Sequence, residues 1–196
     1  MKAEKPDPRS ITWTKRTVRE LESGECSLGI ELGSTNIKST LVSTDGTPIA
    51  SGSSSWENTL VDGHWSYALD DVWSGIQESF RNLVQTVSTD FGVRLTSVAS
   101  LGISAMMHGY LAFDADGELL VPFRTWRDTT TGSAAEKLTQ LFRVNIPLRW
   151  SISHYYQAIL DHEEHVPRVD FLTTLAGYVH WKLTGQKVLG IGDAVG

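Results

Sequence analysis

The residues best suited to chemistry lie in one stretch near the N-terminus, residues 28–43. Two apolar, β-branched runs flank the small-residue turn Gly33-Ser34-Thr35-Asn36, with Glu31 just before the turn and Lys38 just after it. In a strand–turn–strand unit, backbone N–H groups clustered at such a turn can point at one anion, so the pattern indicates a phosphate cradle. An ordinary β-hairpin with a polar turn explains the same residues equally well.

A second group of candidate residues follows the apolar run 98–103, which predicts a buried strand. Five residues suited to ligand binding come after it: Met107, His108, Gly109, Trp126 and Asp128. Because α/β folds bind ligands at the carboxyl ends of strands, this placement indicates a ligand site around His108. A lone histidine is more often structural, so that alternative stays open.

Two other patterns are weaker. The run Gly190-x-Gly192-x-x-x-Gly196 lacks the spacing of a dinucleotide-binding fingerprint, and no helix follows it. The cluster 161–165 (Asp-His-Glu-Glu-His) lacks the spacing that places two imidazoles on one face of a helix. Since it lies beside Pro167, we interpret it as an exposed loop.

The elements that must position these groups alternate between strands and helices. Residues 27–55 predict an antiparallel meander with a turn at Asp45-Gly46, followed by an aromatic loop over 56–68. Apolar residues at helical spacing predict helices over 69–87, 133–142 (with a capping box at its start), 153–160 and 170–183. Further strands are expected at 98–103, 110–113, 119–123 and 187–191. The order predicts an α/β fold in which a mixed β-sheet with an antiparallel meander is flanked by helices.

Composition narrows the class of protein. The chain has 196 residues, of which 40% are hydrophobic and 20% charged, as in globular domains. A net charge of −6 argues against nucleic acid as a partner. No apolar run approaches the ~20 residues that span a bilayer, and we expect no membrane partner. The single cysteine, Cys26, and the lack of a secretory signal favour a reducing, cytoplasmic location.

Together the motifs resemble the FGGY family of carbohydrate kinases from about residue 27 to the end. Residues 28–38 resemble the family's first phosphate motif, and Met107-His108-Gly109 resembles the sugar-contact motif of the xylulokinase branch. Trp126-Arg127-Asp128 resembles the family's Trp-x-Asp segment. Leu183-Thr-Gly185 followed by Asp193-Ala-Val-Gly196 resembles its Leu-Thr-Gly … Asp-Ala-Ser-Gly sequence. Each motif is weak alone, and four in the family's order are fairly specific.

The resemblance implies an actin-like ATPase (ribonuclease H-like) fold. It also implies ATP-dependent phosphorylation of a hydroxyl group on a ketose or a related polyol, with ATP and Mg²⁺ as cofactors. The phosphate-binding residues would be Gly33, Ser34, Thr35, Asn36 and Lys38, and Glu31 would act through the metal. The sugar site would be lined by Met107, His108, Gly109, Trp126 and Asp128.

The resemblance also sets expectations about domains. Residues 1–26 would form an N-terminal extension, and residues 27–196 would form an N-terminal sugar-binding domain that is incomplete at its C-terminal end. In the family the general base and most of the adenine site follow the last motif, so we expect both beyond Gly196 and no catalytic residue in this chain. The chain alone should lack turnover. Its expected partners are the sugar, ATP, the missing C-terminal ATPase domain and, in a homodimer, a second copy.

Four positions depart from the family pattern. Glu31 replaces an Asp, and Met106 replaces a Gln. Thr130 stands where many members carry an Arg, and Ser66, after Trp65, replaces a common Glu. These departures keep two alternatives open, namely a non-catalytic nucleotide- or sugar-sensing module of the actin-like ATPase superfamily and a structural domain without a ligand.

Overall fold

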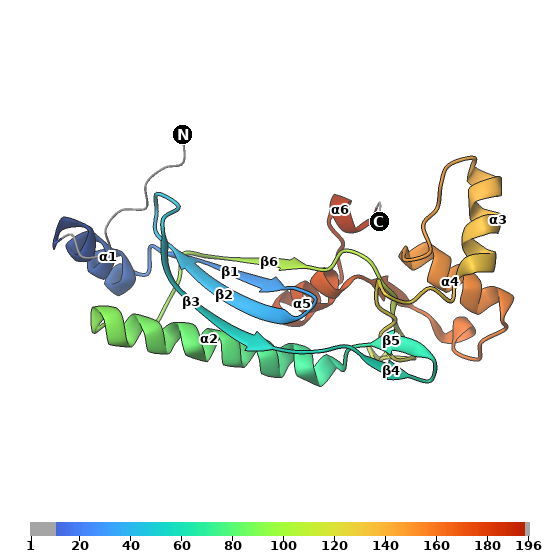
Figure 1. Ribbon diagram of the computed structural model, residues 1–196, viewed down its shortest axis with the longest axis horizontal. Helices are drawn as coiled ribbons and strands as arrows, with labels where there is room; N and C mark the ends of the chain where they lie inside the picture. Colours follow the sequence, from blue (N-terminus) through green and yellow to red (C-terminus); the bar gives the residue numbers. More distant parts are fainter. Residues whose placement is uncertain (1–10, 195–196) are drawn as a thin grey trace. The chain divides into compact units, whose positions relative to one another are not determined.

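The structure, a computed structural model, describes residues 11–194 and divides them into two compact units (Figure 1). The first unit contains residues 11–56 and 73–104, and the second contains residues 57–72 and 105–194. Residues 1–10 of the expected extension, and residues 195–196 of the last sequence motif, lie outside the described residues.

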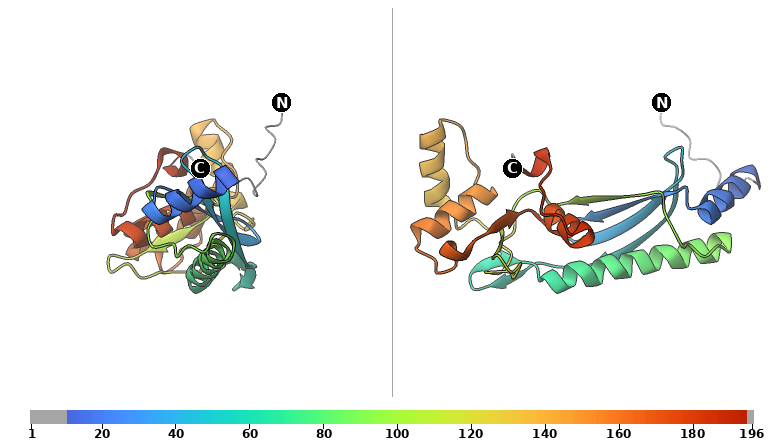
Figure 2. Two further views of the ribbon diagram at one scale, coloured as in Figure 1. Left: turned by 90° about the vertical axis from the view of Figure 1, so that its left-hand side faces the viewer. Right: turned by 180° about the vertical axis from the view of Figure 1, so that it is seen from behind.

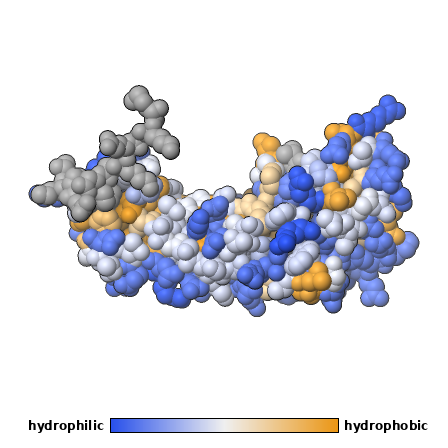
Figure 3. All heavy atoms as spheres, viewed as in Figure 1, coloured by the Kyte–Doolittle hydropathy of each residue, from blue (hydrophilic) through white to orange (hydrophobic). Residues whose placement is uncertain are grey.

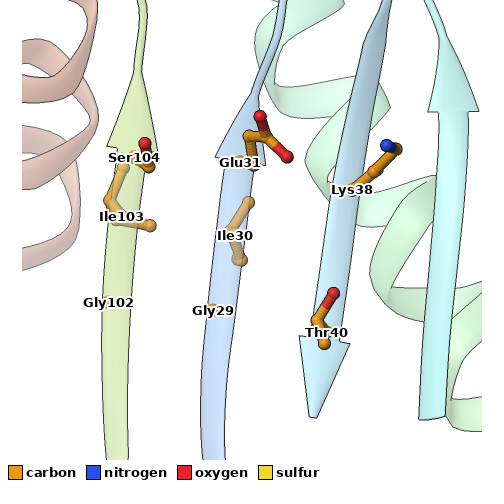
Figure 4. Close-up of a pocket in the computed structure, with 8 residues that line it drawn as sticks. All are labelled: Gly29, Ile30, Glu31, Lys38, Thr40, Gly102, Ile103 and Ser104. Atoms are coloured by element: carbon orange, nitrogen blue, oxygen red, sulfur yellow. The ribbon is translucent and has the colours of Figure 1, made fainter. Parts of the chain in front are cut away.

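The first unit is built on a four-stranded sheet with the strand order β3-β2-β1-β6. Strands β1 (Ser27–Leu32), β2 (Asn36–Val42) and β3 (Pro48–Ser55) form the predicted antiparallel meander. Strand β6 (Ser100–Ala105) runs in the same direction as β1, so the sheet is mixed (Figure 4).

Helix α2 (Leu69–Phe91) covers one face of this sheet from residue 73 onward (Figures 1 and 2). The helix approaches closely because Gly75 has no side chain: a Cβ atom there would lie 2.5 Å from Cδ1 of Ile37. The hydroxyl groups of Ser39 and Ser79 are 2.8 Å apart within this buried layer. Along β1 and β2, buried residues alternate with exposed ones, so the opposite face of the sheet stays open.

Helix α1 (Ile11–Ser23) also belongs to the first unit. The Arg16 guanidinium contacts Glu20 at 2.9 Å and Asp45, in the turn between β2 and β3, at 2.8 Å. Leu21 is buried. The helix is therefore docked on the meander by both ionic and apolar contacts.

The second unit combines short strands with helices. Its strand pairs are β4 (Thr59–Val61) with β5 (His64–Ser66), and β7 (Leu111–Phe113) with β8 (Phe171–Thr173). Its helices are α3 (Gly132–Phe142), α4 (Ser151–Leu160), the 3-10 turn η1 (Val166–Arg168), α5 (Leu175–Thr184) and α6 (Ile191–Ala194). The helices predicted near 133–142 and 153–160 are thus confirmed as α3 and α4.

Several local predictions were wrong. The expected loop 56–68 contains the β4–β5 hairpin, whose turn residues Asp62 and Gly63 have φ values of 51° and 84°. The segment 119–123 forms no continuous strand, although it turns back antiparallel on β7 as predicted: Phe113 bridges Leu119, and the Leu120 amide donates to the Ala112 carbonyl at 2.9 Å.

Four further predictions also differ from the structure. The helix predicted from residue 170 begins at Leu175, because β8 occupies 171–173. Residues 187–190 form no strand, and the helix α6 begins at Ile191. The residue before α3 is Thr131, which makes no side-chain capping bond, so the expected capping box is absent from this helix start. Strand β6 is exposed rather than buried, with Leu101 46% exposed.

Among residues 11–194, no helix combines the length and the apolarity needed to cross a lipid bilayer. On the face shown in Figure 3, hydrophobic side chains gather in separate patches between hydrophilic ones. Large exposed hydrophobic side chains around the end of α3 are Leu141, Phe142 and Val144.

Candidate functional site

The open face of the sheet in the first unit contains a hollow of about 390 Å³ (Figure 4). It is lined by Gly29, Ile30, Glu31, Lys38, Thr40, Gly102, Ile103 and Ser104. At Gly102 no atom lies within 4 Å of where a Cβ atom would stand, and at Gly29 the nearest is 3.9 Å away. The hollow therefore exists because two neighbouring strands carry glycine on this face.

Glu31 and Lys38 are the charged residues of the hollow. They face each other in direct register across β1 and β2, and both are exposed (Figure 4). Within residues 11–194 neither forms an ion pair. An ammonium group with the hydroxyls of Thr40 and Ser104 suits the oxygens of a phosphate group.

Glu31 also fits the expected role toward a metal. Mg²⁺ commonly binds through one or two carboxylates together with waters and substrate phosphates, and Glu31 supplies one such carboxylate. In the described part of the chain, no cluster of three or more His, Cys, Asp or Glu side chains could hold a metal ion by itself. Any Mg²⁺ at Glu31 would therefore depend on oxygens that the nucleotide and water bring.

The turn between β1 and β2 is held by Trp56. The Trp56 indole donates to the carbonyl of Gly33 at 2.7 Å, and the Trp56 amide donates to the carbonyl of Thr35 at 3.1 Å. The Gly33 amide itself donates to the carbonyl of Asn36 at 3.0 Å. The Gly33 amide thus closes the turn, and Ser34 and Thr35 form its exposed tip.

His108 lies in the second unit, three residues beyond the end of β6. Its Nδ1 atom is buried and has no hydrogen-bond partner among the described residues. Burial, together with the positive charge of Arg149, lowers the pKa of His108, so the ring is neutral at pH 7. A buried nitrogen without a partner costs free energy, and a ligand hydroxyl would remove that cost. Its neighbour Met107 is 47% exposed.

Gly109 fixes the backbone next to His108. Its φ is 121°, and a Cβ atom there would lie 2.7 Å from the Phe123 ring and 2.8 Å from the Arg124 carbonyl oxygen. The Ser151 hydroxyl donates to the Gly109 carbonyl at 2.5 Å. Only glycine fits this conformation, which gives the expected motif residue a structural reason.

Trp126 and Asp128 lie in the same segment but differ in accessibility. Trp126 is 40% exposed, whereas Asp128 is 1% exposed. The Asp128 carboxylate accepts a hydrogen bond from the Thr130 amide at 2.8 Å and contacts Nδ1 of His64 at 2.5 Å. Burial opposes ionisation of Asp128, yet these hydrogen bonds hold its pKa below the ordinary value.

His64 belongs to the aromatic loop expected at 56–68, and no sequence motif includes it. It begins β5, directly after the Asp62-Gly63 turn. An Asp-Gly pair between apolar segments is a recognised hairpin signal, and it could have placed His64 on a strand. The contact with Asp128, however, joins residues 64 positions apart in the chain, and no local sequence pattern predicts it.

A buried ionic network lies beside Gly109 in the second unit. The Arg124 guanidinium binds both carboxylate oxygens of Glu163, one of them at 2.8 Å. The Tyr110 hydroxyl contacts Nε2 of His165 at 2.8 Å. The prediction of an exposed loop at 161–165 was therefore wrong for Glu163 and His165, because buried Arg124 and Tyr110 require polar partners.

His154, on α4, is fully buried against this network. Its ring stacks on Tyr110 with centroids 6.2 Å apart, and neither ring nitrogen has a partner among residues 11–194. Burial lowers the pKa of His154 to about 4. The imidazole is therefore neutral at pH 7.

The mixed sheet with its antiparallel meander and its covering helix forms the α/β fold that was predicted. Residues 26–196 match the FGGY family of carbohydrate kinases, N-terminal domain, and the chain belongs to that family. The resemblance seen in the sequence motifs is thereby confirmed.

Curated relatives include xylulose kinases. The chain is 26% identical over 177 residues to the one from Bacillus subtilis and 25% identical over 177 residues to the one from Lactococcus lactis. Each match covers 86% of this chain and 35% of the relative. The chain therefore spans about a third of the length of these relatives.

Solved structures support the fold. A xyloylose kinase from Brucella ovis superimposes with a TM-score of 0.72 at 18% identity. A ligand-bound xylulose kinase from Lactobacillus acidophilus gives 0.66 at 20% identity. Both matches cover 83% of this chain and 34% of the other.

Proposed function

We propose that this chain is the sugar-binding part of an ATP-dependent carbohydrate kinase that phosphorylates a hydroxyl group of a ketose or a related polyol. The observation that carries the proposal is the placement of Glu31 opposite Lys38 in the hollow of the open sheet face. Phosphoryl transfer depends mainly on positioning and charge neutralisation, which such a pair can provide. The names of the relatives make D-xylulose the first sugar to test.

On the phosphate side, three groups would act together. Lys38 would neutralise negative charge on the terminal phosphates of ATP, and the exposed turn tip Ser34-Thr35 would donate hydrogen bonds to them. Glu31 would hold Mg²⁺ through water, and the metal would supply further charge neutralisation. Gly33 and Asn36 would contribute by closing the turn, as their backbone hydrogen bond indicates.

On the sugar side, the half-buried His108 ring would form a hydrogen bond with a sugar hydroxyl. The exposed surfaces of Met107 and Trp126 would contact the C–H surface of the sugar. Gly109 would keep the backbone in the conformation that presents His108. We expect the general base and the adenine site in the remainder of the full-length protein, whose closure over the sugar would exclude water.

A thermal-shift experiment tests this function with D-xylulose, a polyol and Mg·ATP as separate probes. We expect D-xylulose to raise the unfolding temperature of the chain, and His108→Ala to abolish that rise. The matched control is His180→Ala, because His180 is an exposed histidine on α5. A sugar-induced rise that persists in His108→Ala would contradict the site assignment.

The same experiment separates the alternatives. A response to Mg·ATP alone would favour a nucleotide-sensing module over a kinase. The absence of any response would favour a structural domain without a ligand.

Two finer expectations accompany the proposal. Cys26 is free and buried, which is compatible with a reducing, cytoplasmic compartment. Formation of a homodimer stays a prediction, which sedimentation analysis of the purified chain would check.

A further inference from the structure

We propose that His64, not Asp128, forms a hydrogen bond with a hydroxyl group of the sugar. Asp128 is then the positioning residue that holds the His64 ring. This inference rests on the proposed function and assigns a binding role to a residue outside the sequence motifs. It has three supports, which are the burial of Asp128, the tautomer of His64 and the backbone segments that place His64.

The Asp128 carboxylate is buried and has a partner at each of its oxygens. Its side chain is 1% exposed. One carboxylate oxygen accepts the Thr130 amide, and the other is engaged by His64. Because the side chain is buried, a sugar hydroxyl could reach Asp128 only if the residues that cover it moved.

The contact with Asp128 fixes the tautomer of His64. The pKa of Asp128 is below its ordinary value, so the group is a carboxylate at pH 7 and can only accept hydrogen bonds. The Nδ1 atom of His64 must therefore carry the proton, and in the neutral ring Nε2 has a free lone pair. Asp128 is the hydrogen-bond partner that the described residues offer this ring, and the His64 side chain is 24% exposed.

The hairpin that carries His64 is fastened to the segment around Trp126. The Thr125 amide donates to the Trp65 carbonyl at 2.8 Å. The Arg127 guanidinium lies over the Trp65 ring, 4.8 Å from its centroid. Together with the contact between His64 and Asp128, these two contacts hold β5 against the segment around Trp126.

The same segment connects His64 to His108. Arg124 and Tyr110 exchange two backbone hydrogen bonds of 2.8 and 3.2 Å, while Thr125 bonds to β5 on its other side. The backbone at 124–125 is thus the middle of three adjacent segments. One outer segment is β5, which carries His64, and the other contains Tyr110, which lies next to Gly109 and His108. If each segment lies at the usual strand spacing from 124–125, the two outer segments are about 10 Å apart. A ligand with several hydroxyl groups can bridge this separation.

Calorimetric titration of the purified chain with D-xylulose tests the inference. We expect His64→Phe to weaken binding by about tenfold or more, as the loss of a hydrogen bond to a fixed acceptor predicts. Asp128→Asn should weaken binding as well, but should add nothing in the His64→Phe background, because it acts through His64. His180→Phe is the matched control and should bind like the unmodified chain.

A spectroscopic measurement provides a readout that a structural role would not change. In ¹⁵N NMR spectra, His64 should show protonated Nδ1 and unprotonated Nε2, and saturation with D-xylulose should shift the Nε2 resonance. Asp128→Asn should alter the tautomer. This measurement on the unmodified chain remains decisive even if a variant fails to fold.

The outcomes are distinguishable. If D-xylulose binds and requires His108, but His64→Phe binds normally or the Nε2 resonance does not move, the inference is overturned and the proposed function stands. If D-xylulose does not bind the unmodified chain at all, both are overturned. Weakened binding together with a shifted Nε2 resonance supports the inference.

Discussion

A Cβ atom on Gly52 would lie 2.1 Å from the carbonyl oxygen of Ser79, because strand β3 and helix α2 meet backbone to backbone. Gly52→Ala must therefore push the helix away from the sheet, and we expect it to lower the free energy of unfolding by ~1–3 kcal/mol. Urea denaturation measures the change. Gly102→Ala is the control, since nothing lies within 4 Å of its added methyl group. Equal losses in both variants would contradict this explanation.

The two ion pairs of Arg124 and Arg168 differ in burial. Arg124 is 6% exposed in its pair with Glu163, whereas Arg168 is 66% exposed in its pair with Asp114. Arg124→Met removes two charge-assisted hydrogen bonds and leaves the half-buried Glu163 carboxylate without its partner, so we expect a loss of about 1–3 kcal/mol in chemical denaturation. Arg168→Met should change little, because water replaces the lost contact. A stable Arg124→Met variant would show that the network is dispensable.

The burial of His154 predicts a pH dependence of stability. Unfolding returns its pKa from about 4 to an ordinary value near 6.5, so between these pH values the unfolded state binds the additional proton. Stability due to this residue should therefore fall as pH decreases from about 6.5 to about 4, by up to about 3 kcal/mol.

Comparison of variants isolates that contribution. His154→Phe should flatten the pH dependence in this window, and His180→Phe should not. The pKa values of His108 and His165 are also lowered by burial, and their contributions cancel because both are present in every variant. Parallel pH profiles for the His154→Phe variant and the unmodified chain would refute the prediction.

Turnover by the chain alone should be absent. We expect the general base and the adenine site outside residues 1–196, so D-xylulose and Mg·ATP together should release no ADP above the background without sugar. A coupled ADP assay on the purified chain measures this. Robust sugar-dependent release would mean that the 196 residues contain a complete active site.

Local patterns in the sequence predicted the antiparallel meander and helix α2 of the first unit well. Buried Leu28, Ile30 and Leu32 alternate with exposed residues along β1, and the apolar residues of α2 recur at helical spacing. These patterns extend over consecutive residues, so no tertiary information is needed to recognise them.

Pairings between distant residues could not be predicted in this way. Leu111 pairs with Thr173, and Asp128 contacts His64, because packing brings these segments together. The burial of Asp128 could not be predicted for the same reason. Its residue type suggested a contact with the ligand, but Asp128 is buried and contacts His64, which lies 64 positions away in the chain. The roles proposed for the residues of this motif therefore depend on contacts that only the structure reveals.

Strand β6 forms an edge of the four-stranded sheet, and its residues are largely exposed. On the side away from β1, its backbone amide and carbonyl groups can template a strand from another molecule. Leu101 adds an apolar side chain to that edge. In concentrated preparations, this edge is where colloidal instability should originate, and a lysine introduced at position 101 is the natural means of improving solubility.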